Sequence, residues 1–559
     1  MLESRSARPW WRDAVTYQIY IRSFADSNSD GKGDIGGIRS RLGYLKKLGI
    51  DAIWITPWYP SPQKDHGYDV ADYMNIEPDY GTLNDAEMMI KEAHQLGIRV
   101  IIDIVPNHSS DQHSWFQEAI NSAPGSKQRD RYIFRDCKGE NGDIPPNNWQ
   151  AIFGGSAWQR VIEKDGKPGQ WYLHLFAVEQ PDFNWENSEV NEYFERTLRF
   201  WLDRGVDGFR IDVAHGMVKA PGLPDVLEKD SATPEMLAAQ QMPFWDQEGV
   251  HEIYRKWRKI LDSYPGDRMA VAEAWVSPAS RIALYLRPDE LANSFNFDFL
   301  TSLWDVNELK KNIDSSLKAI KEVGAPASWV FNNHDVVRSV DRFALGLQPG
   351  RGETTFDRHG DVTKLDIELG IRRARAGALL MLALPGGAYI YQGEELGLPE
   401  VRDIPEDRLE DPRWLMSNRT DKGRDGCRVP IPWSNDANSA FGFSTNIDIG
   451  NQGSWLPQPS WWGNYAVSIQ EKDTNSTLEL YRKALLIRSN EAGLGDGEME
   501  WLNLGERLLA FKRANNFACI INFGAPFPLP DGEILLSSSP FSGNELPSDC
   551  GVWMRLNEN

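Results

Sequence analysis

Eight short apolar runs alternate with helical stretches between residues 14 and 395. Several of these runs, such as RVIIDIVPNH and VDGFRIDVA, are almost continuously apolar and end in polar residues. That pattern is typical of buried parallel strands. Stretches such as IRSRLGYLKKLG and DAEMMIKEAHQLG repeat their apolar residues with a helical period. We expect strands within residues 14–24, 50–59, 99–108, 206–214, 269–276, 291–300, 327–335 and 386–395.

Eight strand–helix units predict an α/β fold, a (β/α)8 TIM barrel with its active site at the C-terminal ends of the strands. About 97 residues separate the third and fourth strands, which predicts an inserted domain over 109–182. The barrel itself then occupies 1–108 and 183–493, with a long polar loop after the eighth strand and a helix around 475–489. Residues 494–559 alternate apolar and polar positions between turn signals, which predicts a C-terminal antiparallel β-sandwich domain.

Composition and charge narrow the classes of partner. The 559 residues are 41% hydrophobic and 25% charged, as in globular proteins, and carry a formal net charge of -21. Such a surface repels phosphate backbones and anionic lipids, so we expect no nucleic acid and no membrane as partners. There is no leader-like apolar region at the start and no apolar run of about 18 residues. We therefore expect a cytoplasmic location.

Two carboxylates lie where barrel enzymes carry their catalytic groups. The fourth strand ends GFRID, so Asp212 is a candidate nucleophile, and Arg210 faces the same side and would keep it ionised. The fifth strand ends VAEAW, and apolar surroundings would raise the pKa of Glu273 as a general acid requires. Each group could instead form an ordinary structural salt bridge.

Further polar residues follow the third and seventh strands. DIVPNH supplies Asp103, Asn107 and His108, and FNNHD supplies His334 and Asp335. A cluster of His and Asp could bind zinc or iron, but no HExxH-type pair is present. Glycoside chemistry fits better, because it needs two carboxyl groups on either side of the scissile bond.

Taken together, these motifs resemble a known family. DIVPNH, GFRIDVA, VAEAW and FNNHD resemble the four signature regions of the α-amylase family, glycoside hydrolase family 13. QPDFNW at 180–185, the opening WWRDAVTYQIYIRSF and GYDVADY at 67–73 resemble its α-glucosidase and oligo-1,6-glucosidase branch. The resemblance covers essentially the whole chain and implies a barrel, a B domain and a C-terminal β domain.

The resemblance also implies roles for individual residues. Asp212 would be the nucleophile, Glu273 the acid/base and Asp335 the stabiliser of the transition state. Asp65 and Arg428, the latter in GRDGCRVPIPW, resemble the pair that grips the terminal glucose in exo-acting members. Ordinary loop packing is the alternative for that pair and for Tyr68. The remaining implied substrate-binding residues are Tyr68, His108, Arg210 and His334.

The loop DSNSDGKGD carries oxygen donors at alternate positions, which suits Ca²⁺. It is not an EF-hand, because Gly37 stands where that motif needs Glu. In the branch that it resembles, this loop binds a structural Ca²⁺ or Mg²⁺; a solvated acidic turn, or a site filled by the Lys32 ammonium, is the alternative. No catalytic cofactor is expected. The implied ligands are Asp26, Asn28, Asp30, Asp34 and the carbonyl of Lys32.

These observations predict a retaining, exo-acting α-glucosidase that cleaves or transfers terminal glucosyl residues of short oligosaccharides such as maltose. The linkage signals conflict: Val213 is typical of enzymes acting on α-1,6 bonds, whereas AHGMVKAPGLPD resembles enzymes that accept maltose. An oligo-1,6-glucosidase is therefore the first alternative. A glucosyltransferase or isomerase of the same fold is the second, and a catalytically inactive sugar-binding subunit is a remote third. We expect a monomer or homodimer.

Overall fold

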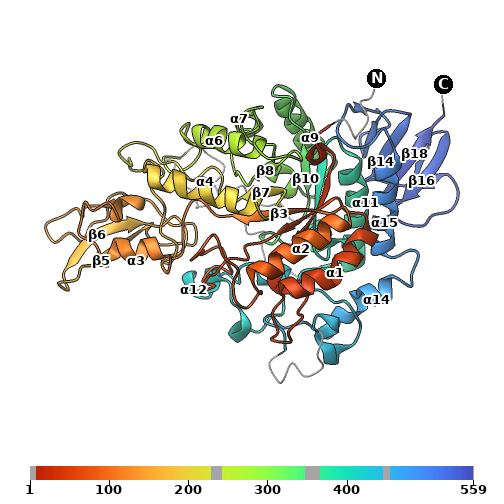
Figure 1. Cartoon of the computed structure of the whole chain (residues 1–559). Helices are drawn as coiled ribbons and strands as arrows, with labels where there is room; N and C mark the ends of the chain where they lie inside the picture. Colours follow the sequence, from red (N-terminus) through yellow and green to blue (C-terminus); the bar gives the residue numbers. More distant parts are fainter. Residues whose placement is uncertain (1–7, 228–241, 346–364, 445–452, 558–559) are drawn as a thin grey trace.

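The computed structural model describes residues 8–227, 242–345, 365–444 and 453–557 (Figure 1). Its central feature is a parallel sheet of eight strands in the order β10-β11-β1-β2-β3-β7-β8-β9. Each of the eight predicted runs contains one strand, so the TIM-barrel prediction is confirmed. The strands are β1 (Val15–Ile19), β2 (Ala52–Ile55), β3 (Arg99–Ile104), β7 (Gly208–Ile211), β8 (Met269–Ala272), β9 (Asn293–Ser294), β10 (Ser328–Val330) and β11 (Gly387–Tyr391).

The barrel is nearly closed, and its weak point is the sixth strand. The predicted strand over 291–300 shortens to two residues, because Phe297–Leu300 forms a helical turn, α8, capped by the Asn296 side chain. Within the described residues, no ladder joins β9 to β10. The gap therefore lies where the chain leaves the sheet early.

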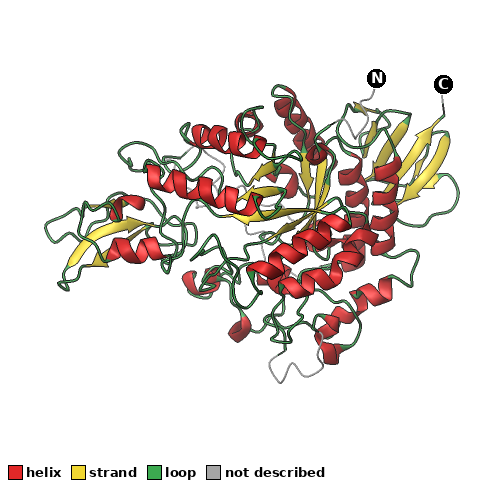
Figure 2. Cartoon of the chain, in the orientation of Figure 1, coloured by secondary structure: helices red, strands yellow, loops and turns green. Residues whose placement is uncertain are grey.

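Helices surround the sheet (Figures 1 and 2). Several of them begin with side-chain caps that the sequence supplies. In α1, for example, Asp34 accepts from the Gly37 N–H, and in α2 Thr82 and Asp85 form a capping box. The helices between and after the strands are α1 (Ile35–Leu48), α2 (Leu83–Gln95), α4 (Ser188–Leu202), α6 (Val250–Asp262), α7 (Ala279–Tyr285), α9 (Val306–Lys321), α10 (Ser339–Leu345), α11 (Ile367–Ala383), α12 (Pro412–Met416), α13 (Asp425–Arg428), α14 (Val467–Gln470) and α15 (Thr477–Asn490).

Two further units flank the barrel at opposite ends of Figure 1. The region between β3 and α4 contains α3 (Ser114–Ile120) and a small antiparallel sheet of β4 (Phe134–Arg135), β6 (Pro168–Leu173) and β5 (Trp158–Ile162). The predicted boundaries at 109–182 enclose these elements, and the domain limits themselves stay a prediction.

The C-terminal unit is antiparallel, as its alternating sequence predicts. A five-stranded sheet faces a two-stranded one, and buried residues such as Ile520, Leu529 and Leu546 pack in the same apolar cluster. The first sheet also packs on α11, and the Trp553 indole donates to the Leu379 carbonyl at 3.0 Å. The strands are β12 (Glu500–Trp501), β13 (Leu508–Lys512), β14 (Phe517–Asn522), β18 (Cys550–Leu556) and β16 (Gly532–Ser537), with β15 (Phe527–Pro528) beside β17 (Glu545–Leu546).

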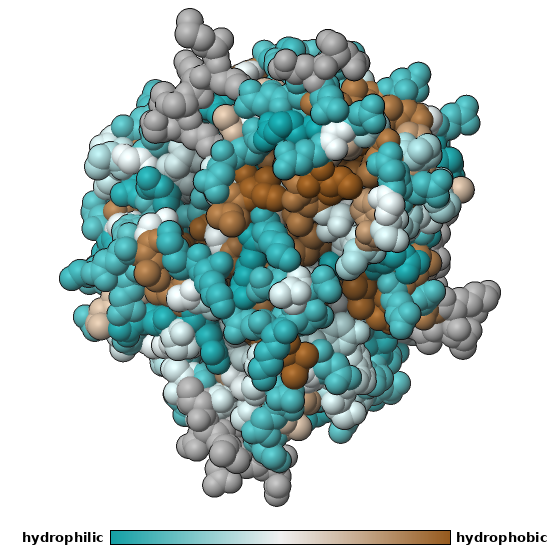
Figure 3. Space-filling model, turned by 90° about the vertical axis from the view of Figure 1, so that its right-hand side faces the viewer, coloured by the Kyte–Doolittle hydropathy of each residue, from teal (hydrophilic) through white to brown (hydrophobic). Residues whose placement is uncertain are grey.

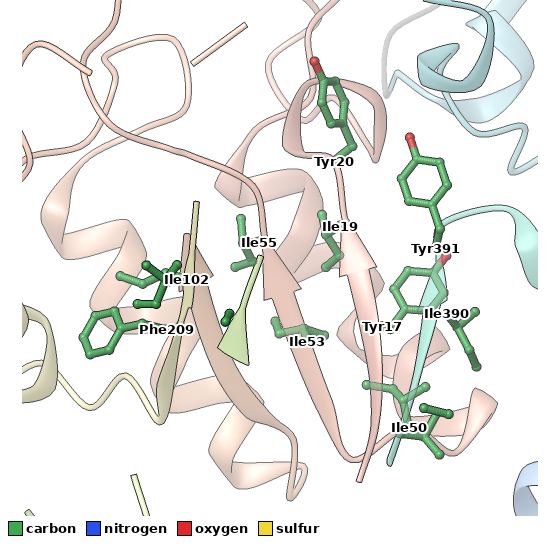
Figure 4. Packing of buried hydrophobic residues seen from close by; sticks show 14 of the residues in the cluster. Tyr17, Ile19, Tyr20, Ile50, Ile53, Ile55, Ile102, Phe209, Ile390 and Tyr391 are labelled. Carbon is green, nitrogen blue, oxygen red and sulfur yellow. The ribbon is translucent and has the colours of Figure 1, made fainter. Parts of the chain in front are cut away.

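Alternate residues of the barrel strands face two different cores. Ile53, Ile55 and Ile102 belong to the large cluster that includes helix residues, and Figure 4 shows them with their neighbours on β1 and β11. Trp54 and Ile101 belong instead to a smaller cluster with β8 and β10 residues, inside the barrel. The same alternation decides which polar side chains reach the barrel axis.

The face shown in Figure 3 is mostly hydrophilic, with hydrophobic residues gathered in a band across its upper middle. In the described part of the chain, the large apolar side chains that are most exposed include Ile162, Leu415 and Leu486. Among the described residues, no helix has both the length and the apolar character needed to cross a bilayer.

Candidate active site

One buried guanidinium organises the C-terminal mouth of the barrel. Arg210 is paired in register with Asp103 on β3 and with Val271 on β8, so its side chain points inward like theirs. Its Nη1 donates to Asp103 at 2.8 Å and to Asp212 at 2.6 Å. Its Nη2 lies 2.7 Å from a carboxyl oxygen of Glu273. The fourth and fifth strands therefore bring their terminal carboxyl groups to one cation.

Charge and burial act against each other at Asp212, whose side chain is almost fully buried. Burial raises the pKa of Asp212, the Arg210 guanidinium lowers it, and the neighbouring carboxyls of Glu273 and Asp103 raise it again, leaving it well above its ordinary value. The Arg210 guanidinium therefore offsets only part of the effect of burial and of the neighbouring carboxyls on Asp212, which differs from the expectation that this cation keeps Asp212 ionised.

The residue after Asp212 has an unusual backbone. Val213 has a φ of 45°, which is uncommon for a β-branched residue. In this conformation its N–H donates to Glu273 at 3.0 Å, and the Trp275 indole donates to the other oxygen of that carboxyl at 3.3 Å. The strained turn thus fixes the position of Glu273, as strained residues in functional sites often do.

Asp335 is held by three cations or potential cations. It accepts from Arg424 and from Arg428, each at 3.0 Å, and its other oxygen lies 3.3 Å from the His334 imidazole. Burial raises the pKa of Asp335, but His334, Arg424 and Arg428 outweigh it and leave the pKa below its ordinary value. Asp335 is therefore ionised at neutral pH.

The structure gives Asp65 a different ion-pair partner from Arg428, and the sugar-binding role of Asp65 and Arg428 stays a prediction. Asp65 forms its ion pair with Arg424 at 2.9 Å, and Arg424 also binds Asp411 at 2.7 Å. Arg428 lies beneath the site, where it contacts Asp335 and the His334 carbonyl. Arg424 immediately precedes the short helix α13, whereas Arg428 is its last residue. Both guanidiniums reach the same oxygen of Asp335, and Arg424 also reaches Asp65.

Neutral rings complete the wall. The Tyr68 ring stacks on His334 with centroids 5.3 Å apart, and its hydroxyl donates to Asp103 at 3.1 Å. His108 lies against the Gln180 amide at 3.1 Å. Burial lowers the pKa of His108 to about 4 and that of His334 well below its ordinary value, so both are neutral near pH 7. Neutral imidazoles suit hydrogen bonding to hydroxyl groups.

These groups open into one cavity of about 150 Å³. Seven of the predicted residues line it, whereas Arg210 and Arg428 lie behind its wall, each with 1% of its surface exposed. The lining residues are Asp65, Tyr68, His108, Ile152, Phe153, Phe176, Asp212, Val213, His215, Trp245, Glu273, Trp275, His334, Asp335, Val336, Arg413 and Arg424. A wall of this kind, apolar with a few convergent polar groups, is typical of a ligand pocket.

In the predicted metal loop, the acidic and amide side chains accept hydrogen bonds from backbone N–H groups of the same loop. Asp26 accepts from three N–H groups of the loop, Asn28 accepts from the Asp30 N–H at 2.9 Å, and Asp34 caps α1. The Lys32 ammonium turns away to Asp79, at 2.7 Å. In the part of the chain that is described, no three His, Cys, Asp or Glu side chains gather as a metal site. The oxygen donors nevertheless have the chemistry that Ca²⁺ and Mg²⁺ require.

Comparison with known proteins places this site in a family. Residues 18–497 match the model of the α-amylase catalytic domain. The chain is 37% identical to a probable α-glucosidase of Rhizobium meliloti, covering 91% of this chain and 88% of the relative. It is 37% identical to an oligo-1,6-glucosidase of Parageobacillus thermoglucosidasius, covering 86% and 84%.

A comparison with a solved structure supports the same family. The fold superposes on an α-glucosyl transfer enzyme with a TM-score of 0.83 and 32% identity, covering 98% of this chain and 99% of the other. The match therefore extends beyond the barrel to both flanking units. The chain belongs to the α-amylase family, glycoside hydrolase family 13, and is a glycoside hydrolase.

Proposed function

We propose that this enzyme is a retaining, exo-acting α-glucosidase that removes terminal α-glucosyl residues from short oligosaccharides. The arrangement around Arg210 carries the proposal, because one guanidinium holds both Asp212 and Glu273 at hydrogen-bond distance. Carboxyls bound to adjacent nitrogens of one guanidinium support the short separation of retaining enzymes. The Asp65–Arg424 ion pair beside Asp335 supports a pocket that accepts a chain end.

The reaction would proceed by double displacement. Glu273 gives its proton to the glycosidic oxygen, while an Asp212 oxygen bonds to the anomeric carbon and the bond to the leaving sugar breaks. Glu273 then takes a proton from water, whose oxygen replaces Asp212 at the anomeric carbon. Both side chains return to their initial states, and a sugar hydroxyl in place of water would give transglucosylation. Asp335 would bind hydroxyls of the glucosyl ring and stabilise its developing positive charge.

Linkage separates this proposal from its first alternative, an oligo-1,6-glucosidase. Val213 lines the cavity and favours the alternative, whereas the AHGMVKAPGLPD segment favours maltose. Maltose and isomaltose can be followed in parallel by proton NMR of the anomeric signals. We expect α-glucose to be released first from maltose. Faster cleavage of isomaltose would establish the alternative, and initial release of β-glucose would contradict retention.

Replacing Arg424 tests the closed pocket. In Arg424→Ala, Asp65 and Asp411 lose a buried cation, and we expect kcat/KM for maltose to fall at least about 100-fold. Lysine should not rescue it, because a point charge cannot bridge three carboxylates. Arg129→Ala is the control: Arg129 is also buried, and it is ion-paired with Glu163 in the inserted region. It should lower Tm without changing KM, and similar losses in both variants would contradict a role in binding.

We also propose a structural Ca²⁺ or Mg²⁺ in the loop at 26–34, held by the side chains of Asp26, Asn28, Asp30 and Asp34 and by the Lys32 carbonyl. The bound ion would tie this loop together at the start of α1. Removing metal with EDTA should lower Tm by several degrees, and adding Ca²⁺ should restore it. Asp30→Asn should weaken this response, whereas Asp79→Asn, which alters only the Lys32 partner, should keep it. Identical melting with and without Ca²⁺ would contradict the proposal.

A cytoplasmic location and a monomer or homodimer complete the proposal. The negative net charge supports a protein whose copies repel one another and do not form a large assembly. Light scattering coupled to size-exclusion chromatography distinguishes the two states, since the chain has a mass of 63.4 kDa.

A further inference from the structure

The cavity has a second wall that the mechanism above does not use. His215 and Trp245 both line it, and they are buried, with exposed fractions of 3% and 2%. Their rings lie 4.6 Å apart at an angle of 32°. His215 follows Asp212 by three residues, and Trp245 comes from the segment that leads into α6.

Both side chains carry buried polar atoms without partners. Neither imidazole nitrogen of His215, nor the indole nitrogen of Trp245, makes a hydrogen bond with the described residues. The Glu273 carbonyl accepts from the Ala214 N–H at 2.8 Å and also faces the imidazole, so it can satisfy at most one nitrogen of His215. The other imidazole nitrogen and the indole nitrogen of Trp245 then still have no partner among the described residues. Buried polar groups in folded proteins are almost always paired, so these atoms point to a polar ligand in the cavity.

The wall is rigid. The Asp246 N–H donates to the His215 carbonyl at 2.8 Å, and the Asp246 carboxylate is held by Arg281 at 2.7 Å and by Tyr285 at 2.8 Å. Gly216 leaves room for the indole, because a Cβ there would lie 2.5 Å from Trp245. A ligand would therefore meet donors whose positions are already set.

The place of this wall indicates which ligand it meets. Asp65, Arg424 and Asp335 are joined by ion pairs at one part of the cavity, where the terminal glucose would bind. His215 lies beside the backbone of Glu273, the group that would protonate the leaving oxygen. The leaving sugar must lie on the side of Glu273.

We propose that His215 and Trp245 form the subsite for the sugar on the leaving-group side, which is the second glucose of a disaccharide and the acceptor in transfer. This inference rests on the proposed function. Burial lowers the pKa of His215 to about 3, so its neutral ring can both donate to and accept from sugar hydroxyls. The Trp245 indole donates through its nitrogen and offers an apolar edge.

The test compares two substrates that share the glucosyl ring and differ in the leaving group. The leaving group of maltose is a glucose, which carries several hydroxyls. The leaving group of p-nitrophenyl α-glucoside is p-nitrophenol, which has no sugar hydroxyls. For His215→Leu and Trp245→Phe we expect kcat/KM for maltose to fall about tenfold and for the aryl glucoside less than about threefold. His215→Asn, which keeps hydrogen-bonding atoms, should recover part of the loss on maltose.

Trp149→Phe is the matched control. Trp149 and Trp245 belong to the same cluster of buried apolar residues. The Trp149 indole donates to the Pro224 carbonyl, and Trp149 does not line the cavity. Its ratio of maltose to aryl-glucoside activity should equal that of the wild type. Equal losses on both substrates in the His215 and Trp245 variants, or no loss, would overturn the inference alone. A wild type that cleaves neither substrate would overturn the proposed function and the inference with it.

Discussion

Asp212→Asn is expected to lower kcat/KM by at least about 10⁴-fold, on maltose and on aryl glucosides alike. The amide cannot form the bond to the anomeric carbon, so the first displacement fails whatever the leaving group. The substitution keeps nearly the same volume and leaves an oxygen that can accept from Arg210, so the fold should survive. Circular dichroism and Tm measurements check that survival before the kinetics are compared.

A variant without the Asp212 side chain tests from which face of the sugar the nucleophile attacks. In Asp212→Gly, azide can enter the space left by the carboxylate and bond to the anomeric carbon as the leaving group departs. The product from an activated α-glucoside should therefore be β-glucosyl azide, because a single displacement inverts the configuration. NMR of the product distinguishes the two anomers.

Asp103→Gly is the matched control for the azide experiment. Asp103 also accepts from Nη1 of Arg210, but it does not line the cavity. Its loss should weaken activity through Arg210 and should give no rescue by azide. Substantial activity in Asp212→Asn, or azide rescue in Asp103→Gly, would place the nucleophile elsewhere.

Much of this site could be predicted because the strands obey a period of two. Once the run VDGFRIDVA is read as a strand, Arg210 and Asp212 must share a face, and the barrel directs that face to the axis. The apolar runs before Glu273 and His334 likewise end at the same mouth. The local sequence therefore sufficed to predict which residues form strands and at which end of the barrel the polar side chains gather.

Contacts that depend on loops and short helical turns could not be predicted from the sequence. Arg424 and Arg428 lie four residues apart in one motif, and only the position of α13 shows that Arg424 reaches Asp65. Trp245 joins the cavity through a close approach to Gly216, a contact between distant segments that no spacing reveals. His215 carried a weak signal, since it lies three residues after the proposed nucleophile.

Glu273→Gln should separate substrates by their leaving groups. We expect kcat/KM for maltose to fall about 10²–10⁴-fold, because its sugar leaving group needs a proton. The loss on an activated glucoside such as glucosyl fluoride should be much smaller for the first step, which needs little protonation. The glutamine oxygen can still accept from the Val213 N–H, so the position of the side chain should be preserved.

Azide supplies the complementary readout. The second displacement in Glu273→Gln lacks its base, so a glucosyl-enzyme should accumulate from activated donors. Azide needs no base and should release it as α-glucosyl azide, the anomer opposite to that from Asp212→Gly. Opposite anomers from the two variants would assign the two carboxylates to opposite faces of the sugar.

The control is Glu395→Gln, a buried glutamate that accepts from Tyr17 and Tyr44 away from the cavity. It should change Tm and affect both substrates equally. Equal losses on maltose and glucosyl fluoride in Glu273→Gln would mean that Glu273, like Glu395, does not protonate the leaving group. The Val213 turn and the Arg210 contact would then serve to hold a structural carboxylate, and the proton donor would have to be another group on the cavity wall.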